Sequence, residues 1–191
     1  SDVEKEVIEN IIDGARFAPS AKNTQSTKFI VIENKMLLRS VASATGEWLG
    51  KTAQQLKNPL LRKLYLLRGE KSAQEVTKWI SQFELISERM RSGSDPILRG
   101  APALVLFYAR QSINFAEANA NLAVQNAMLI ASSLGLGTFY TGYVVAASGR
   151  DKTMRGLLKL PKKHKVYGGL AVGYPEITFS KWIERNPAKI T

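Results

Sequence analysis

The feature that most constrains this chain is a long stretch without a charged side chain, which runs from Ala118 to Gly149. Residues 114–134, at its start, have the length and pattern of a long helix that is apolar on nearly all sides. Polar side chains interrupt every window that is long enough to cross a bilayer, so a membrane span is not expected. They are Asn119, Asn121, Gln125, Asn126, Ser132 and Ser133. The pattern predicts a helix buried at the centre of a domain or at a subunit interface.

The segments around this helix alternate between strand-like and helix-like patterns. Short apolar runs predict strands, and apolar side chains at helical spacing predict helices. The expected strands are residues 28–33, 103–109, 138–143 and 166–172. The other expected helices are residues 3–17, 35–49, 60–67 and 72–91. Because the 191 residues contain no repeat and no internal linker, we expect one α+β domain.

Composition excludes several kinds of site. The sequence has no cysteine, which removes disulfides, thiolate metal sites and cysteine nucleophiles and fits a reducing, cytoplasmic compartment. The acidic, helical start is no signal peptide. The lone His164, in a lysine-rich turn, is predicted to be an ordinary surface residue, and no metal site is expected. Since no nucleophile or acid–base motif occurs, the chain is either no enzyme or one whose cofactor does the chemistry.

The net charge of +11 is uneven along the sequence. Residues 150–191 hold 10 Lys and Arg against 3 Asp and Glu, whereas residues 1–45 hold 6 of each kind. A basic C-terminal third suggests an anionic partner, and composition leaves open a phosphate-bearing cofactor, a nucleic acid or a membrane surface. A solvated basic surface is the simpler interpretation for most of these lysines.

The stretch ARFAPSAKNTQS, residues 15–26, separates two strongly patterned elements. Pro19 fixes one backbone angle, and Ser20 offers a hydroxyl. Asn23 and Gln25 each offer a hydrogen-bond donor and an acceptor. Together these groups suit a flat heterocycle such as the pyrimidine edge of a flavin. Taken alone, the stretch is explained at least as well by a turn whose polar side chains satisfy one another.

Three further segments, in order with this stretch, resemble the nitroreductase family of FMN-dependent oxidoreductases. They read LGLGTFYTGY at 134–143, GLAVGYPE at 169–176 and KWIERNPAKIT at 181–191. The matching family features are an A-P-S-x-x-N-x-Q stretch after the first helix, an apolar central helix ending in L-G-L-G, a G-x-P-like turn and a basic tail. The resemblance covers roughly residues 5–45 and 101–191.

The resemblance implies a nitroreductase-like fold, in which a central, mostly antiparallel sheet is flanked by helices and two chains form an intertwined homodimer. Residues 1–191 would be a single domain, with a helical insertion at about 46–100 that often caps the substrate site in this family. The uncharged helix would lie at the dimer interface, and the tail would wrap the partner.

The resemblance also implies which residues bind the cofactor. Those expected along the ring and ribityl side of FMN are Pro19, Ser20, Asn23 and Gln25. Thr141 and Gly142 would present backbone groups near the reactive ring nitrogen, where close approach suits glycine. Lys181 and Arg185 would hold the phosphate, for which the arginine fork is suited. No side chain would be catalytic, because the flavin carries the chemistry.

In the implied reaction, FMN takes a hydride from NADH or NADPH and passes electrons to a nitroaromatic, quinone or similar small acceptor by a ping-pong mechanism. Family members also carry an R-R-S-x-R segment before the first helix, which supplies much of the phosphate site. The printed sequence begins at Ser1, after the place of that segment. Either the sequence is part of a longer protein, or its phosphate site is incomplete; some relatives have a ferredoxin-like domain upstream of that segment.

Other functions remain open from the sequence. A family member without flavin would keep the fold and act through interactions. A basic nucleic-acid-binding module fits the net charge, but no recognisable motif supports it, so a nucleic-acid partner is not expected. Flavoenzymes of this type that cleave flavin or dehalogenate aromatic rings are a third alternative. Substrate choice would then depend on residues 46–100, where Trp48, Tyr65 and Trp79 are expected mainly to pack between helices.

Overall fold

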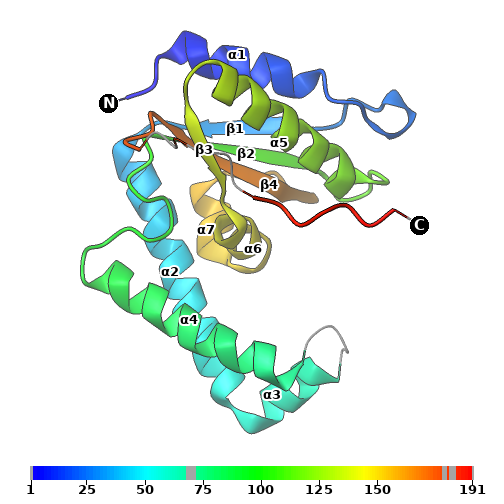
Figure 1. Ribbon diagram of the computed structural model, residues 1–191. Coiled ribbons are helices and arrows are strands. Elements are labelled where there is room, and N and C mark those ends of the chain that lie inside the picture. The colour runs from blue at the N-terminus through cyan, green and yellow to red at the C-terminus, as the bar shows by residue number, and fades with distance from the viewer. Residues whose placement is uncertain (1, 68–71, 178–179, 181–183, 191) are drawn as a thin grey trace.

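A four-stranded antiparallel sheet lies at the centre of the protein (Figure 1). The computed structural model describes residues 2–67, 72–177, 180 and 184–190. The strands are β1 (Lys28–Ile32), β2 (Ala103–Arg110), β3 (Gly137–Tyr140) and β4 (His164–Gly173), in the spatial order β1-β2-β4-β3. The inner strands β2 and β4 are largely buried, which explains why their sequences contain continuous apolar runs.

Helices cover both faces of the sheet (Figure 1). On one face, α1 (Lys5–Arg16) packs against α5 (Ala116–Ser133), and α5 lies over β2 and β4. The other face is covered by α6 (Gly142–Arg150), α7 (Lys152–Leu157) and the first half of α2 (Lys35–Lys57). The sheet therefore separates two helical layers.

Each layer has its own apolar core, and β2 contributes to both. Val105 and Phe107 belong to the core shared with α1 and α5, whereas Leu104 and Leu106 belong to the core shared with α2, α6 and α7. Successive side chains of a strand point to opposite faces, so one continuous apolar run fills both layers. The expected α+β fold with a central antiparallel sheet flanked by helices is confirmed.

The second half of α2 extends away from the sheet with α3 (Pro59–Leu66) and α4 (Ala73–Arg91) (Figure 1). α2 and α4 pack so closely that a Cβ added to Gly50 of α2 would lie only 2.5 Å from the hydroxyl oxygen of Ser87 in α4. The rings of Tyr65 and Trp79 meet edge to face with centroids 6.4 Å apart, so these aromatic side chains pack between helices as expected.

Four elements, α2, β3, α6 and α7, and the position of His164 differ from the sequence-based prediction. Helix α2 does not end near residue 49 but continues to Lys57. The strand expected at 138–143 ends at Tyr140, because the chain turns there into α6, whose apolar side packs on β4; α6 and α7 were not predicted. His164 does not lie in the turn but begins β4, where its ring contacts a tyrosine of β2.

The long, largely apolar helix is confirmed as α5, which has one charged residue, Glu117, in its first turn; within one chain it is buried on one side only. Ala120, Ala123 and Ala127 face the core, whereas Leu122 and Leu129 are 45 % and 59 % exposed. Among the described residues, none of the helices has both the length and the apolarity to cross a lipid bilayer.

Candidate functional site

The loop between α1 and β1 has an unusual backbone. Lys22, Asn23 and Gln25 have φ angles of 55°, 52° and 45°, in the left-handed region that residues with a Cβ seldom adopt. Asparagine tolerates this region better than lysine or glutamine does. Such strain persists only where surrounding contacts determine the conformation, and it is concentrated at ligand sites and active sites. The loop is therefore a candidate binding element.

The four site residues that were predicted here lie together on this loop. Ser20 Oγ accepts a hydrogen bond from the backbone N–H of Gln25 at 3.0 Å, and Gln25 Nε2 donates to Asn23 Oδ1 at 3.1 Å. Pro19 is exposed at the start of the loop. Within the described chain, Asn23 Nδ2 and Gln25 Oε1 have no hydrogen-bond partner, which leaves one amide donor and one amide acceptor for a ligand.

One residue of this site was missed in the sequence, where it only interrupted an apolar helix. Asn119 of α5 is 3 % exposed. Its Oδ1 accepts from the backbone N–H of Ala21 at 3.0 Å, and its Nδ2 donates to Thr24 Oγ1 at 3.4 Å. A single asparagine in a row of small core residues was the signal, because a buried amide needs partners.

A cavity of about 260 Å³ lies beside the loop. Its polar lining comes from Ser20, Gln25, Thr27 and Asn119, and Arg16 is the one charged residue among the lining side chains. The apolar lining consists of Ala15, Ala18, Phe29 and Ala123. A larger hollow of about 780 Å³ between α2 and α4 is lined largely by charged and amide side chains and contains none of the predicted site residues.

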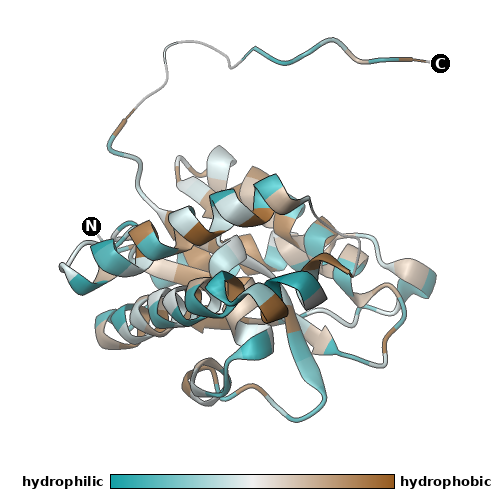
Figure 2. Cartoon of the chain, turned by 90° about the horizontal axis from the view of Figure 1, so that it is seen from below, coloured by the Kyte–Doolittle hydropathy of each residue, from teal (hydrophilic) through white to brown (hydrophobic). Residues whose placement is uncertain are grey.

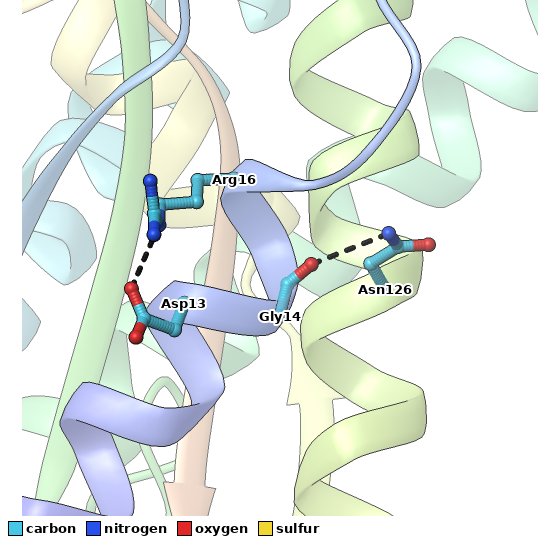
Figure 3. A network of polar contacts seen from close by, with 4 residues as sticks. All are labelled: Asp13, Gly14, Arg16 and Asn126. Atoms are coloured by element: carbon cyan, nitrogen blue, oxygen red, sulfur yellow. Dashed lines mark hydrogen bonds and ion pairs between the residues drawn. The ribbon is translucent and has the colours of Figure 1, made fainter.

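Close contact between α1 and α5 fixes the wall of this cavity (Figure 3). Arg16 Nε lies 2.7 Å from Asp13 Oδ1, and Asn126 Nδ2 donates to the carbonyl oxygen of Gly14 at 3.3 Å. A Cβ on Gly14 would lie 2.4 Å from Ile130 Cγ1, so only glycine permits this approach. The packing of the two helices thus positions Arg16 at the cavity.

The second predicted group lies where β3 ends. The N–H of Thr141 donates to the carbonyl oxygen of Gly169 at 2.9 Å. Thr141 is 3 % exposed, and in the described part of the chain its Oγ1 has no hydrogen-bond partner. Gly142 follows as the first residue of α6. The first N–H groups of a helix lack helical partners and carry partial positive charge, so this turn can bind a negatively charged or hydrogen-bond-accepting atom.

Tyr140 borders the same turn. Its hydroxyl donates to the carbonyl oxygen of Tyr167 at 3.1 Å, and its ring lies 3.8 Å from the position of a Cβ on Gly142. Burial, followed by the nearby negative charge of Glu117, raises the pKa of Tyr140, and the same two causes raise the pKa of Tyr167. Both phenols therefore stay neutral at physiological pH, and Tyr140 acts there as a hydrogen-bond donor, not as a base.

The two groups of predicted residues lie at opposite edges of the sheet. Residues 19–25 lead into the edge strand β1, and Thr141 and Gly142 follow the other edge strand, β3. Three strand spacings separate these edges, which is about 14 Å. Neither Thr141 nor Gly142 lines the cavity beside the loop. One chain therefore does not assemble all the predicted ring-binding residues in one pocket.

The predicted phosphate-binding residues lie in the C-terminal segment. Lys181 lies outside the described residues. Arg185 is exposed, and residues 184–190 lie apart from the folded body (Figure 2). A single chain thus does not bring Arg185 to the loop or to the turn after β3.

Comparison with known families decides the family of the chain. The model of the nitroreductase family matches residues 1–174. The chain belongs to the nitroreductase family. The match includes the loop at 19–25 and the turn at 141–142 but not Arg185. No curated protein sequence matches the chain.

Solved structures with the nitroreductase fold resemble the chain over nearly its whole length. A nitroreductase with bound FMN from Bacteroides fragilis has a TM-score of 0.71 at 18 % identity, over 100 % of this chain and 89 % of that one. Iodotyrosine deiodinase bound to FMN and 3-iodo-L-tyrosine has a TM-score of 0.67 at 19 % identity, with the same coverage. A nitroreductase with bound FMN from Desulfitobacterium hafniense has a TM-score of 0.68 at 18 % identity, over 97 % and 85 % of the two chains.

Proposed function

We propose that the chain is an FMN-dependent oxidoreductase that passes electrons from NADH or NADPH to a small acceptor such as a nitroaromatic or a quinone. The observation that carries the proposal is the strained loop, which holds Ser20, Asn23 and Gln25 beside a cavity in a member of the nitroreductase family. The FMN in the similar solved structures supports this choice of cofactor.

The side chains of the loop fit the edge of a flavin ring. The free amide groups of Asn23 and Gln25 offer one donor and one acceptor, and the ring of Phe29 gives the adjoining cavity an apolar side. The exposed backbone of Gly142, which has no side chain and begins α6, fits a second, close contact. Lys181 and Arg185 would hold the phosphate.

Bound FMN would supply the hydride and electron transfer that no side chain of this protein can perform. The loop would orient the ring through Ser20, Asn23 and Gln25. The N-terminus of α6 would stabilise negative charge that develops on the ring, because its first N–H groups point to that end of the helix. Tyr140, held neutral by its raised pKa, would keep its hydrogen bond and fix the turn during turnover.

A homodimer would complete the site. After Glu117 in its first turn, α5 carries no charged residue, and five of its exposed residues recur at alternating intervals of four and three, which is the spacing of a helix–helix seam. They are Ala118, Leu122, Gln125, Leu129 and Ser132. A two-fold axis beside this seam would bring the loop of one subunit near the Thr141 turn of the other. The separation of the two groups within one chain supports such a shared site.

The helical segment at about 46–100 is proposed as a cap on the substrate side. It consists of the second half of α2 together with α3 and α4, and it projects from the sheet (Figure 1). A projecting segment can reach across a dimer to cover a neighbouring site. The acceptor would then be selected by side chains of this segment.

Gly142 offers the sharpest test of the flavin site. A Cβ at this position would meet only the ring of Tyr140, at an ordinary 3.8 Å, so the fold tolerates alanine. If a flavin lies against this backbone, Gly142→Ala lowers FMN affinity about tenfold or more, because one methyl group blocks close approach. The measurement is the visible absorption and fluorescence of the protein after incubation with FMN and removal of the excess.

The matched control is Gly149→Ala, at the other end of the same helix. A Cβ on Gly149 would lie 3.9 Å from a lysine side chain, again an ordinary contact, so FMN retention and NAD(P)H oxidation should be unchanged. A wild-type protein that never retains FMN would contradict the proposal. It would favour the alternative of a flavin-free family member that acts through interactions.

A further inference from the structure

The strained loop needs a cause for its shape. Two of its left-handed residues, Lys22 and Gln25, are of types that gain nothing locally from this conformation. Two short-range backbone hydrogen bonds lie within the loop, and its side-chain bonds, from the Gln25 N–H to Ser20 Oγ and from Gln25 Nε2 to Asn23 Oδ1, are exposed to water, which competes for their partners. These bonds alone are a weak constraint on the backbone.

A buried side chain from another element supplies the missing constraint. In the described structure, Asn119 is the one side chain outside residues 20–26 that forms hydrogen bonds to the loop. It binds Ala21 at one end of the left-handed segment and Thr24 near the other end. Because Asn119 is 3 % exposed and both bonds are partly buried, water competes less for them than for the exposed bonds within the loop.

Asn119 also lines the cavity beside the loop, together with Ser20 and Gln25. Two other asparagines of α5 form hydrogen bonds elsewhere and do not line this cavity. Asn121 binds its own helix at the carbonyl oxygen of Glu117, and Asn126 binds α1 at Gly14. The three asparagines thus lie on one helix but bind three different parts of the protein.

We propose that Asn119 is a positioning residue that presets the loop for cofactor binding. It holds the loop, including the left-handed residues Lys22, Asn23 and Gln25, in its conformation before the ligand arrives, so that the amide groups of Asn23 and Gln25 face the ligand without further ordering. A preset loop spares the ligand the entropic cost of arranging it. The inference rests on the proposed flavin function, but its effect on the loop itself does not require flavin.

The test compares Asn119→Ala with wild type in two measurements. The first is amide hydrogen exchange in the protein without FMN. The N–H of Ala21 is bonded to Asn119, so its exchange should accelerate about tenfold or more in the variant. The second is FMN affinity from fluorescence quenching, which should fall about tenfold for the loss of two partly buried hydrogen bonds.

Two further variants separate positioning from general stability. Asn119→Asp keeps an oxygen that can accept from both the Ala21 N–H and the Thr24 hydroxyl, so it should restore the slow exchange of Ala21. Asn126→Ala removes a hydrogen bond of the same helix to α1, and it should lower the melting temperature without accelerating exchange at Ala21. Should Asn119→Ala fail to fold, Thr24→Val tests the second bond alone, with about a threefold loss of FMN affinity expected.

Unchanged exchange at Ala21 in Asn119→Ala would overturn the proposal. Faster exchange with unchanged FMN affinity would also overturn it, because the loop would then be held without any benefit to the ligand. If wild type binds no FMN at all, the flavin function fails and so does the cofactor role of Asn119. The exchange measurement would still show whether this residue holds the loop.

Discussion

Because Gly169 has no side chain, the turn after β3 can pack directly against β4. A Cβ on Gly169 would be 2.4 Å from Thr141 Oγ1 and 3.0 Å from Leu106 Cδ2. Both neighbours are buried, so neither can move aside freely. The carbonyl oxygen of Gly169 also accepts a hydrogen bond from the backbone N–H of Thr141. Gly169 therefore fixes the turn both by leaving room for it and by this hydrogen bond.

Gly169→Ala is accordingly expected to lower the free energy of unfolding by about 2 kcal/mol through overpacking. Denaturation with urea measures this. Gly156→Ala in α7 is the control, because a Cβ there meets nothing within 4 Å and alanine favours helix by about 0.5–1 kcal/mol. In a Thr141→Ala background the cost of Gly169→Ala should fall by about 1 kcal/mol or more, whereas Thr141→Ser, which keeps the oxygen, should leave it unchanged. Equal costs in all three backgrounds would show that Thr141 is not the limiting contact.

At the scale of helices and strands, the sequence was informative wherever a pattern was long. The apolar run of β2 and the uncharged pattern of α5 were predicted nearly to their ends, because burial determines both composition and structure there. The segment from Thr138 to Tyr143 was misread, since its local composition favours a strand. Its end depends instead on Gly169, a contact distant in sequence.

The residues of the candidate site likewise include some that the sequence could indicate and others that only the structure reveals. Ser20, Asn23 and Gln25 could be selected because polar side chains cluster on a short loop, and the structure brings them together. Asn119 could not be assigned to that loop, because its partner Ala21 is 98 positions away along the chain. The left-handed backbone at Lys22 and Gln25 could not be predicted from the sequence either, since these residue types do not favour that conformation.

The exposed face of α5 leads to a prediction about assembly. Two changes, Leu122→Lys and Leu129→Lys, place charges on an otherwise uncharged seam whose leucines are now 45 % and 59 % exposed. If this face joins two copies, the double variant should be a monomer at micromolar concentration by light scattering, where wild type is a dimer, because an unpaired charge in an interface is costly. The control is Leu85→Lys, at a leucine of α4 that is 48 % exposed. A monomeric wild type would remove the proposed interface altogether.

For the molecule as a whole, the central question is whether one site is built from one chain or from two. Residues 19–25 and the Thr141 turn lie at opposite edges of one sheet, about 14 Å apart by strand spacing. If each site takes its loop from one subunit and its turn from the other, damage to the two parts should complement in a mixed dimer. If each site lies within one chain, it should not.

The experiment needs two variants that each lose FMN as pure dimers. One carries Asn23→Ala and Gln25→Ala in the loop, and the other carries Gly142→Val in the turn. When they are unfolded together and refolded, half of the dimers are mixed, and a shared site predicts one intact site in each mixed dimer. About one quarter of the wild-type FMN binding and NAD(P)H oxidation should then return. Mixing each variant with itself is the control. No recovery from the mixture, with mixed dimers shown by mass spectrometry, would place each site within a single chain.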